Sequence, residues 1–411
     1  NAALVAGINV AVTIISGILT LKKIRPLFNM QGKLFGMMVQ IINGVAKFRL
    51  AGAESRAFAD WGKQYRHQLH LMLDSQSIED NLVVINNILS ALTPAVIFAF
   101  TINLLQASQD GSFSTGTFLA FNAAFGTFIG GTTNLSTTII DILEALPLWE
   151  RAQPILQAIP EVDSSKSDPG QLSGKVEINH VVFRYRSDGQ LTLDDVCLRA
   201  QPGEFIALVG PSGSGKSTLL RLLLGFDLSE SGSICYDGQE LAGLDINAVR
   251  RQLGVVLQNS RLMSASIFDN ISSNAVITME EAWTAATMAG LASDIASMPM
   301  GMHTVVSEGG TNLSGGQRQR LLIARSLALR PRILLFDEAT SALDNKTQAI
   351  VSESLEKLNV TRIVVAHRLS TIRNADRIYV LQNGRLVQQG NFEELAQQSG
   401  LFSQLIMRQN F

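Results

Sequence analysis

The sequence predicts a protein of two parts, an all-α part that crosses a membrane and an α/β part built on a parallel sheet. Three long apolar runs fill much of the chain before about residue 150. Further on, two short buried-strand patterns each end in residues typical of a phosphate or metal site. The chain has 411 residues, which is too many for one compact core, so more than one domain is expected.

The overall composition favours a membrane protein. Apolar residues make up 46% and charged residues 17%, against about a quarter charged in soluble domains, and the mean hydropathy is +0.20. The formal net charge of −2 argues against a general nucleic-acid binder, so no nucleic-acid partner is expected. The two cysteines, Cys197 and Cys235, lie far apart and form no metal-ligand spacing, and we expect two reduced, buried thiols.

Each apolar run is near the ~20 residues that a helix needs to cross the hydrocarbon core of a bilayer. The runs span Leu4–Leu21, Leu82–Ala107 and Phe113–Ile140. Buried helices of a large soluble protein are the alternative, but three such runs so close together favour membrane helices. Basic residues are frequent from Lys22 to Asp74, whereas the link after the second run carries only Asp110. Because basic flanks stay in the cytoplasm, the basic stretch and everything after the third run are predicted to be cytosolic.

The basic stretch is itself predicted to be helical, because apolar residues repeat at spacings of three and four from Leu34 to Phe48. A helix continuous to about residue 43 would be about 65 Å long, twice the thickness of a bilayer core. Pro26 and Pro94 can kink their helices, which membrane helices tolerate. The apolar seam breaks at Leu50–Ala53, where a short connecting helix at a cytoplasmic tip is expected, with an ordinary surface loop as the alternative.

A buried-strand pattern, Phe205–Val209, runs directly into a glycine-rich loop and then a helix, which is the P-loop pattern in its required context. Glycines let backbone N–H groups wrap a phosphate, and the helix N-terminus adds the positive end of its dipole. Lys216 would reach the β- and γ-phosphates of ATP, and the Ser217 hydroxyl would bind Mg²⁺. The nucleotide-binding residues predicted in this loop are Gly210, Pro211, Ser212, Gly213, Ser214, Gly215, Lys216, Ser217 and Thr218.

A second buried strand, Ile333–Phe336, ends in Asp337 and Glu338. An acid at the carboxyl end of a parallel strand can hold Mg²⁺ at the open edge of the sheet, so Asp337 is predicted as a nucleotide-site metal partner, directly or through water. Glu338 would orient and polarise the attacking water. A pair of helix-capping acids is the alternative.

A second glycine-rich turn lies between these two motifs and precedes a helix. Serine and two glycines at that place make another anion-binding N-terminus. Because the P-loop already serves the ATP of this chain, the second turn makes sense if it contacts the ATP of a partner chain, with an ordinary N-cap as the alternative. The turn consists of Leu313, Ser314, Gly315, Gly316 and Gln317.

Taken in order, these motifs resemble an ABC ATPase domain over residues 176–411. The resemblance adds Gln258 after a strand, the run Ser341–Asp344, and His367 after a strand at Ile363–Ala366. It implies that Tyr185 stacks on adenine, a contact worth about 1–3 kcal/mol by analogy with base–aromatic stacking. It also implies that His367 holds the γ-phosphate and that Gln258 contacts Mg²⁺ or water. The implied catalytic residues are Glu338, His367 and Gln258, and the implied Mg²⁺ ligands are Ser217, Gln258 and Asp337.

The resemblance also implies a second subunit, identical or different. Ser314 and Gly316 would contact the γ-phosphate of the ATP bound to the opposite subunit, and Asp344 would help to couple the two sites. With membrane helices upstream on the same chain, the arrangement resembles an ABC exporter half-transporter. The runs then look like transmembrane helices four to six, and residues 50–59 look like the second coupling helix. Because the chain starts at Asn1 inside an apolar run, we expect earlier residues of the protein to precede it.

This likeness implies a fold of two domains and a location. A partial all-α transmembrane domain of the type 1 ABC exporter kind is expected at residues 1–159 and a linker at 160–175. An α/β P-loop ATP-binding domain is expected at 176–411. The implied place is the inner (plasma) membrane of a bacterium, in contact with lipid and with the ATP-binding domain in the cytoplasm. The implied activity is ATP-driven export.

Narrower similarities concern the substrate. Four segments resemble ABC subunits that export bacteriocin-type peptides bearing nitrile-hydratase-like leaders, which implies a peptide substrate. A lipid or drug exporter is the alternative at the level of substrate. A non-transport ABC ATPase is the alternative at the level of function, and the fused apolar runs oppose it. The segments are Asn43–Lys47, Ala51–Glu54, Phe118–Gly126 and Met298–His303.

Overall fold

The computed structural model describes residues 2–107, 115–158, 160, 166–340, 342–366 and 368–409. The chain divides into two compact units, Asn1–Ile159 and Pro160–Phe411. The first unit is helical, and the second contains both β-sheets of the described chain.

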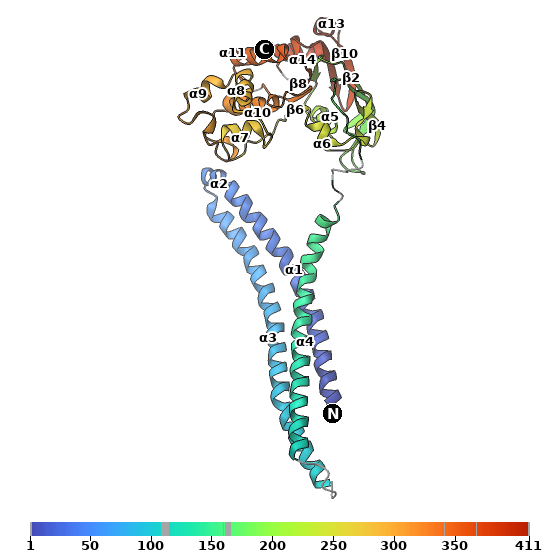
Figure 1. Cartoon of the computed structure of the whole chain (residues 1–411), viewed down its shortest axis with the longest axis vertical. Helices are drawn as coiled ribbons and strands as arrows, with labels where there is room; N and C mark the ends of the chain where they lie inside the picture. Colours follow the sequence, from blue (N-terminus) through green and yellow to red (C-terminus); the bar gives the residue numbers. More distant parts are fainter. Residues whose placement is uncertain are drawn as a thin grey trace. The chain divides into compact units, whose positions relative to one another are not determined.

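Three long helices and one short helix make up the described part of the first unit. Helices α1 (Ala2–Asn43) and α3 (Glu54–Ala107) are joined through the short α2 (Val45–Ala51), and α4 (Thr115–Leu156) packs mainly along α1 (Figure 1). The expected continuous helix to about residue 43 is confirmed by α1. Pro26 lies inside α1 and Pro94 inside α3, so neither proline ends its helix.

The helix break lies where the sequence predicts it, but the short helix precedes the break. Gly44 separates α1 from α2, and Gly52 ends α2 in the left-handed conformation with φ 59°. Glycine is the residue best suited to such a helix end because it has no side chain to clash. Residues 54–59, expected within the connecting helix, instead form the first turns of α3, since only Ala53 separates Gly52 from the start of that helix.

Two ion pairs join α1 to the other two long helices, and both use basic residues just after the first apolar run. The Nζ atom of Lys23 on α1 lies 2.8 Å from a carboxylate oxygen of Asp74 on α3, and Arg25 on α1 pairs with Glu150 on α4. The hydrogen bond from Lys23 holds the pKa of Asp74 below its usual range. All four side chains are largely exposed, so these pairs orient the helices more than they stabilise them.

The apolar stretches of the described helices are short relative to what a membrane crossing needs. Within the described residues, no helix taken alone is both long and apolar enough to cross a membrane, whereas Gly17–Asn43 together with Val45–Ala51 meets that criterion as a pair bent by 67°. A shorter apolar stretch, Phe118–Gly131, lies within α4. The three membrane spans therefore stay predictions, and the expected external link at residues 108–112 lies outside the described residues.

The second unit contains a six-stranded sheet in the order β10-β9-β3-β8-β7-β6. Its neighbouring strands run parallel except for β10, which pairs antiparallel with β9. The second sheet has the order β2-β1-β4-β5 and is antiparallel. The strands are β1 (Val176–Phe183), β2 (Leu193–Ala200), β3 (Phe205–Val209), β4 (Ser231–Tyr236), β5 (Gln239–Glu240), β6 (Leu253–Val256), β7 (Ile333–Asp337), β8 (Thr361–Val365), β9 (Arg377–Gln382) and β10 (Arg385–Gly390).

The six-stranded sheet is covered by several helices on one face and by fewer helices and the antiparallel sheet on the other, so its central strands are buried on both faces. Every residue of β3 and β7 is buried, as expected for parallel strands with both faces covered. The P-loop and the Asp337–Glu338 pair lie at the carboxyl ends of these two buried strands. The helices of this unit are α5 (Lys216–Leu223), α6 (Ile246–Arg250), α7 (Ile267–Ser272), α8 (Met279–Met288), α9 (Ala292–Ser297), α10 (Gly315–Leu327), α11 (Asn345–Lys357), α12 (Leu369–Arg373), α13 (Phe392–Gln397) and α14 (Leu401–Gln409).

The expectation of two buried thiols is wrong for Cys197. Both cysteines are free, and Cys235 on β4 is half-buried, whereas Cys197 on β2 is exposed. Side chains alternate between the two faces of a strand, so Cys197, which lies between the buried residues Val196 and Leu198, faces solvent.

Candidate nucleotide-binding site

The predicted site residues follow four neighbouring parallel strands. The P-loop follows β3, His367 follows β8, Asp337 ends β7, and Gln258 lies just after β6. These strands are adjacent in the order β3-β8-β7-β6. Because the carboxyl ends of parallel strands meet at one edge of a sheet, the motifs gather at that edge. The His367 position lies outside the described residues.

Lys216 begins α5, and its ammonium group turns back into the loop. Its Nζ atom donates to the carbonyl oxygens of Gly210, at 2.9 Å, and of Pro211, at 2.8 Å. The residue is 6% exposed, and this burial lowers the pKa of the Lys216 amine, while the charges of Asp337 and Glu338 oppose the shift. The Lys216 ammonium group therefore donates to carbonyls of its own loop and is attracted by two acidic residues.

The loop is closed at its base and open at its rim. Pro211, Ser212, Gly213 and Ser217 are exposed, whereas Ser214, Gly215 and Thr218 are buried with Lys216. Glycine is required at the entrance, because a Cβ atom on Gly210 would lie 2.1 Å from the carbonyl oxygen of Leu381 on β9. The arrangement presents backbone N–H groups and a helix N-terminus to solvent, which suits an anionic ligand.

Tyr185 reaches the P-loop from the antiparallel sheet. It lies two residues after β1, and its hydroxyl oxygen is 3.1 Å from Oγ1 of Thr218. Its ring stands edge-on to Phe183, with ring centroids 4.9 Å apart. The residue is 56% exposed, so a positioned aromatic ring with open surface lies beside the phosphate cradle, which suits stacking on a planar base.

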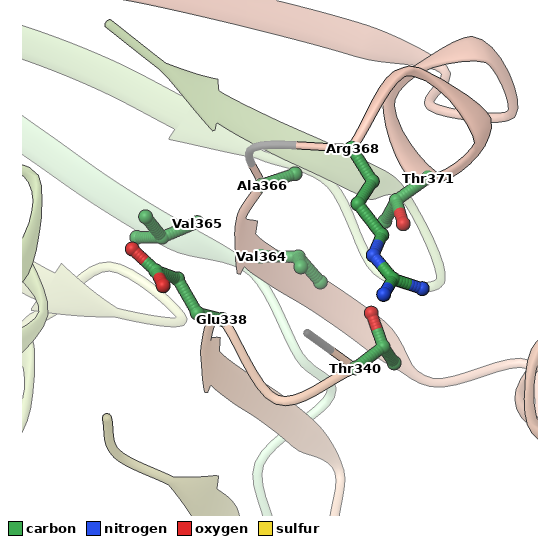
Figure 2. A pocket seen from close by; sticks show the side chains of 7 residues that line it. All are labelled: Glu338, Thr340, Val364, Val365, Ala366, Arg368 and Thr371. Carbon is green, nitrogen blue, oxygen red and sulfur yellow. The ribbon is translucent and has the colours of Figure 1, made fainter. Parts of the chain in front are cut away.

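Glu338 occupies an unusual backbone conformation directly after β7. Its φ of 55° is left-handed, which is uncommon for a residue other than glycine and suggests a functional constraint. The Glu338 N–H donates to the Val365 carbonyl of β8 at 3.2 Å. Figure 2 shows the side chain lining a pocket, with its carboxylate directed toward Val365 and the Arg368 guanidinium directed toward Thr340.

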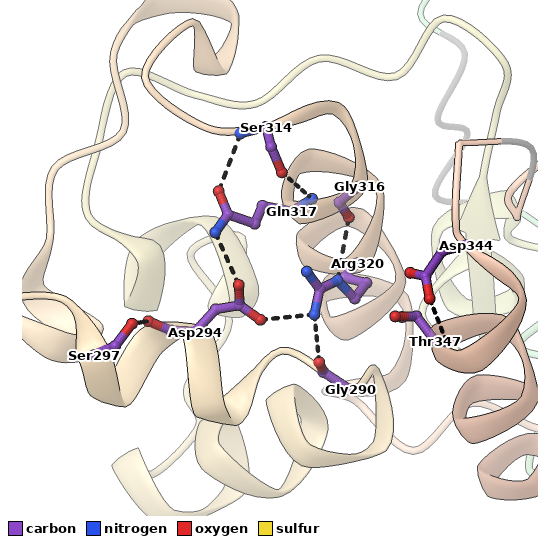
Figure 3. A network of polar contacts seen from close by, with 9 residues as sticks. All are labelled: Gly290, Asp294, Ser297, Ser314, Gly316, Gln317, Arg320, Asp344 and Thr347. Atoms are coloured by element: carbon purple, nitrogen blue, oxygen red, sulfur yellow. Dashed lines mark hydrogen bonds and ion pairs between the residues drawn. The ribbon is translucent and has the colours of Figure 1, made fainter.

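The turn before α10 is closed by its own side chains. Ser314 is the N-cap of α10: its Oγ accepts from the Gln317 N–H at 3.2 Å, and the Gln317 side chain accepts from the Ser314 N–H at 3.0 Å. Gln317 also donates to one oxygen of Asp294 at 2.9 Å, and Arg320 donates to the other at 2.7 Å (Figure 3). The capping alternative therefore describes the fold of this turn. Capping still leaves other N–H groups of this helix start available to a ligand, since the first N–H groups of a helix have no partner within that helix.

The remaining residues of the turn divide into buried and exposed positions. Leu313 is buried and anchors the turn, whereas Ser314 and Gly315 are exposed. A Cβ atom on Gly316 would lie 3.6 Å from the carbonyl oxygen of Ala342, so this helix start lies close to the segment before α11.

Asp344 is the N-cap of α11. Its carboxylate accepts a hydrogen bond from the Thr347 N–H at 3.2 Å, and the bonds from Thr347 hold the pKa of Asp344 below its usual range. Asp344 is exposed. The residue is thus ionised at neutral pH and lies on the surface, where a partner can reach it.

Two residues near the motifs were not predicted to matter. Gln319 donates to the Glu338 carbonyl at 3.0 Å and accepts from the Ala342 N–H at 2.7 Å, so it joins α10 to the segment that follows β7. Arg368 donates to the Leu343 carbonyl at 2.8 Å. Each is a long polar side chain close in sequence to a motif, and that proximity is the signal that could have found them. The role of Asp294 has no such local signal.

The oxygen-rich donor set at the sheet edge fits Mg²⁺. Ser217 offers a hydroxyl, Gln258 an amide oxygen and Asp337 a carboxylate, and Mg²⁺ prefers oxygen ligands together with water. Ser217 and Gln258 are exposed, whereas Asp337 is buried at 4% exposure. Three protein donors leave about three of the six positions of octahedral Mg²⁺ for phosphate and water.

The chain is similar to known transport proteins. The profile described as "ABC transporter" matches residues 193–341. The toxin RTX-III translocation ATP-binding protein of Actinobacillus pleuropneumoniae is 41% identical over 296 residues, which are 71% of this chain and 42% of that protein. The alpha-hemolysin translocation ATP-binding protein HlyB of Escherichia coli O157:H7 is 42% identical over 288 residues, which are 69% of this chain and 41% of that protein. The chain thus spans about two fifths of the length of these relatives.

A solved structure resembles the whole chain. A bacterial Atm1-family ABC exporter with ATP bound matches with a TM-score of 0.91 and 30% sequence identity, covering 100% of this chain and 72% of that chain. The likeness therefore includes the helical unit as well as the sheets and the P-loop. The chain belongs to the ABC exporter family.

Proposed function

We propose that this chain is a half-transporter that hydrolyses ATP and uses the energy to drive export across a membrane. The observation that carries the proposal is the gathering of the P-loop, Gln258 and the Asp337–Glu338 pair on neighbouring strand ends. Such an edge holds a triphosphate, its metal ion and a water-orienting carboxylate within reach of one another. The similarity to translocation ATP-binding proteins supports export as the use of that energy.

The proposed chemistry assigns one task to each residue. Lys216 neutralises the β- and γ-phosphates, and Tyr185 stacks on the adenine. Glu338 accepts a hydrogen bond from the attacking water and directs it at the γ-phosphorus, while His367 holds the γ-phosphate. A bound Mg²⁺ would neutralise charge on the phosphate oxygens. The residues proposed to hold it are Ser217, Gln258 and Asp337.

A second half-transporter completes each site in this proposal. The helix-start N–H groups of the exposed Gly315 and the half-buried Gly316, together with the Ser314 hydroxyl, contact the γ-phosphate bound by the other subunit. Asp344 lies at the surface near this turn and couples the two sites. The partner is a second copy of this chain or a related half-transporter.

The proposed domain limits and location follow the same family arrangement. Residues 1–159 belong to the transmembrane part, 160–175 form a linker, and 176–411 bind ATP in the cytoplasm. The membrane is the inner membrane of a bacterium, and lipid surrounds the apolar runs. The division into two compact units near residue 160 supports this limit.

The proposed cargo is a peptide of the bacteriocin type with a nitrile-hydratase-like leader. The similarity to proteins named for the translocation or export of toxins supports a peptide or protein cargo. A lipid or drug is the competing cargo. Stimulation of ATPase activity by added leader-bearing peptide, but not by lipid or drug, distinguishes the two proposals.

The central test is the ATPase rate of the chain in lipid vesicles. Glu338→Gln keeps the shape of the side chain but weakens its ability to orient water, so the rate should fall by about 100-fold or more, while ATP binding persists. Glu393→Gln, an exposed acid on α13, is the matched control and should leave the rate unchanged. Equal rates for wild type and Glu338→Gln would refute the assigned role.

A further inference from the structure

We propose that His180, Asp195 and Cys197 form a binding site for Zn²⁺ or a similar transition-metal ion, separate from the nucleotide site. One ligand atom from each of these residues lies within 4.8 Å of the other two. Imidazole nitrogen, carboxylate oxygen and thiolate sulfur are the side-chain ligands that Zn²⁺ takes in proteins. The sulfur and the imidazole distinguish this site from one for Mg²⁺ or Ca²⁺, which prefer oxygen ligands.

Irregular backbone brings the three side chains together. The register of the β1–β2 pair shifts on either side of Val181. His180, with φ 51°, lies at the first shift, and Asp195, with φ 56°, lies at the second. Bulges of this kind redirect side chains. Cys197 stands opposite the first shift, so residues from two strands converge on one exposed face.

The existing contacts favour metal binding. The Nδ1 atom of His180 lies 2.7 Å from a carboxylate oxygen of Asp195, and the backbone N–H of His180 donates to the Cys197 sulfur at 3.2 Å. This contact holds the sulfur beside His180, and the thiolate is the form of cysteine that binds metal. Tetrahedral Zn²⁺ sets such ligand atoms about 3.3–3.6 Å apart, so small side-chain rotations suffice.

The site is open to solvent. The side chains of His180 and Asp195 are 78% and 65% exposed, and Cys197 is exposed as well. An ion can therefore enter directly, and water can complete the coordination. A surface ion pair would account for His180 and Asp195 alone, but it leaves the placement of the Cys197 sulfur unexplained.

Metal binding changes the protonation of the sulfur. The Cys197 thiol releases its proton to solvent as the sulfur–metal bond forms, and His180 binds through a ring nitrogen that carries no proton. The charged neighbours on the paired strands include Asp194 on β2, which is ion-paired with Arg385.

The test is a titration of the purified 411-residue chain, without a polyhistidine tag and without nucleotide, with Co²⁺ as a spectroscopic substitute for Zn²⁺. One Co²⁺ per chain should bind with a thiolate-to-cobalt charge-transfer band, and Zn²⁺ should displace it. Cys197→Ser should abolish the band. His180→Asn and Asp195→Asn should weaken binding by at least about tenfold, and Asn is chosen because it tolerates a left-handed backbone.

Cys235→Ser is the matched control, since Cys235 is the other free cysteine, and it should keep the band and the affinity. ATP binding should be unchanged in all four variants, which shows that each remains folded. The proposal is overturned if wild type shows no band at millimolar Co²⁺, if Cys197→Ser keeps it, or if Cys235→Ser loses it. It is also overturned if His180→Asn and Asp195→Asn both bind as wild type does.

Discussion

The P-loop and the Ser314 turn are both glycine-rich turns at the start of a helix, yet the structure completes them in opposite ways. The base of the P-loop is buried, and Lys216 donates to carbonyls of its own loop. In the Ser314 turn, Ser314 and Gly315 are exposed, and the half-buried Gln317 donates a hydrogen bond to Asp294. The first turn has a basic group ready for phosphate, while the second has only a helix end and a hydroxyl. We therefore expect the first to bind ATP alone and the second to contribute only when another surface brings a phosphate to it.

The largest expected effect is on ATP affinity, and it comes from removing the Lys216 charge, which the P-loop has and the Ser314 turn lacks. Lys216→Ala should weaken ATP binding by about 100-fold or more, because a buried charge-assisted contact to phosphate is lost. Lys357→Ala, which removes an exposed lysine paired with Glu353 on α11, should leave affinity unchanged. Fluorescent nucleotide titration measures both. Unchanged affinity in Lys216→Ala would remove the distinction between the turns.

The second prediction uses two serine caps of the same kind. Ser314 caps α10 and Ser266 caps α7, each within a capping box. Replacement by Ala should lower the free energy of unfolding by about 1 kcal/mol in either case. Only Ser314→Ala should also reduce the ATPase rate, by about tenfold or more, with ATP binding retained. If the Ser266→Ala rate falls equally, loss of stability rather than loss of phosphate contact explains the effect.

A smaller effect on ATP affinity tests the Tyr185 ring, which lies beside the P-loop. Tyr185→Ala should weaken ATP binding by about tenfold, since base–aromatic stacking contributes about 1–3 kcal/mol. Tyr185→Phe keeps the ring and loses the hydroxyl contacts with Thr218 and Arg221, so its affinity should stay within about threefold of wild type. Isothermal titration with ATP gives both values. Equal losses in the two variants would assign the effect to the hydroxyl and not to stacking.

The smallest effect near neutral pH concerns the charge of Lys216. Burial lowers the pKa of this amine from its usual 10.5, so it deprotonates at a lower pH than an exposed lysine does. Because only the charged form attracts phosphate, ATP affinity should decrease as the pH rises through that lowered pKa, and ATP binding there should take up a proton. Titrations from neutral to alkaline pH measure this dependence. Lys216→Arg keeps its charge over that range and should show a flat profile.

Local patterns predicted the strands and helices that carry the motifs. Strand β3 coincides with the predicted Phe205–Val209, and α1 ends at Asn43 as expected. These successes rest on buried apolar runs and on glycine-rich turns, whose signals lie within a few neighbouring residues. The roles assigned to the site residues stay predictions.

The features that the sequence did not predict correctly depend on contacts between residues far apart in the chain or on irregular backbone. The hydrogen bonds of Asp294 with Gln317 and Arg320 join separate helices, and no local pattern announces them. The exposure of Cys197 follows from its face of β2, which the register of a sheet decides. The short α2 was expected a few residues too late, because Gly44 is as compatible with a helix interior as with its end.

The uninterrupted course of α3 has a mechanical consequence. The helix runs 54 residues from Glu54 to Ala107, and Pro94 lies inside it. Proline lacks the N–H that would bond to the carbonyl four residues earlier, so bending is easiest there. The stretch from Glu54 to Pro94 is about 60 Å long and acts as a stiff lever. A small tilt imposed at its α2 end therefore becomes a much larger sideways displacement near the proline.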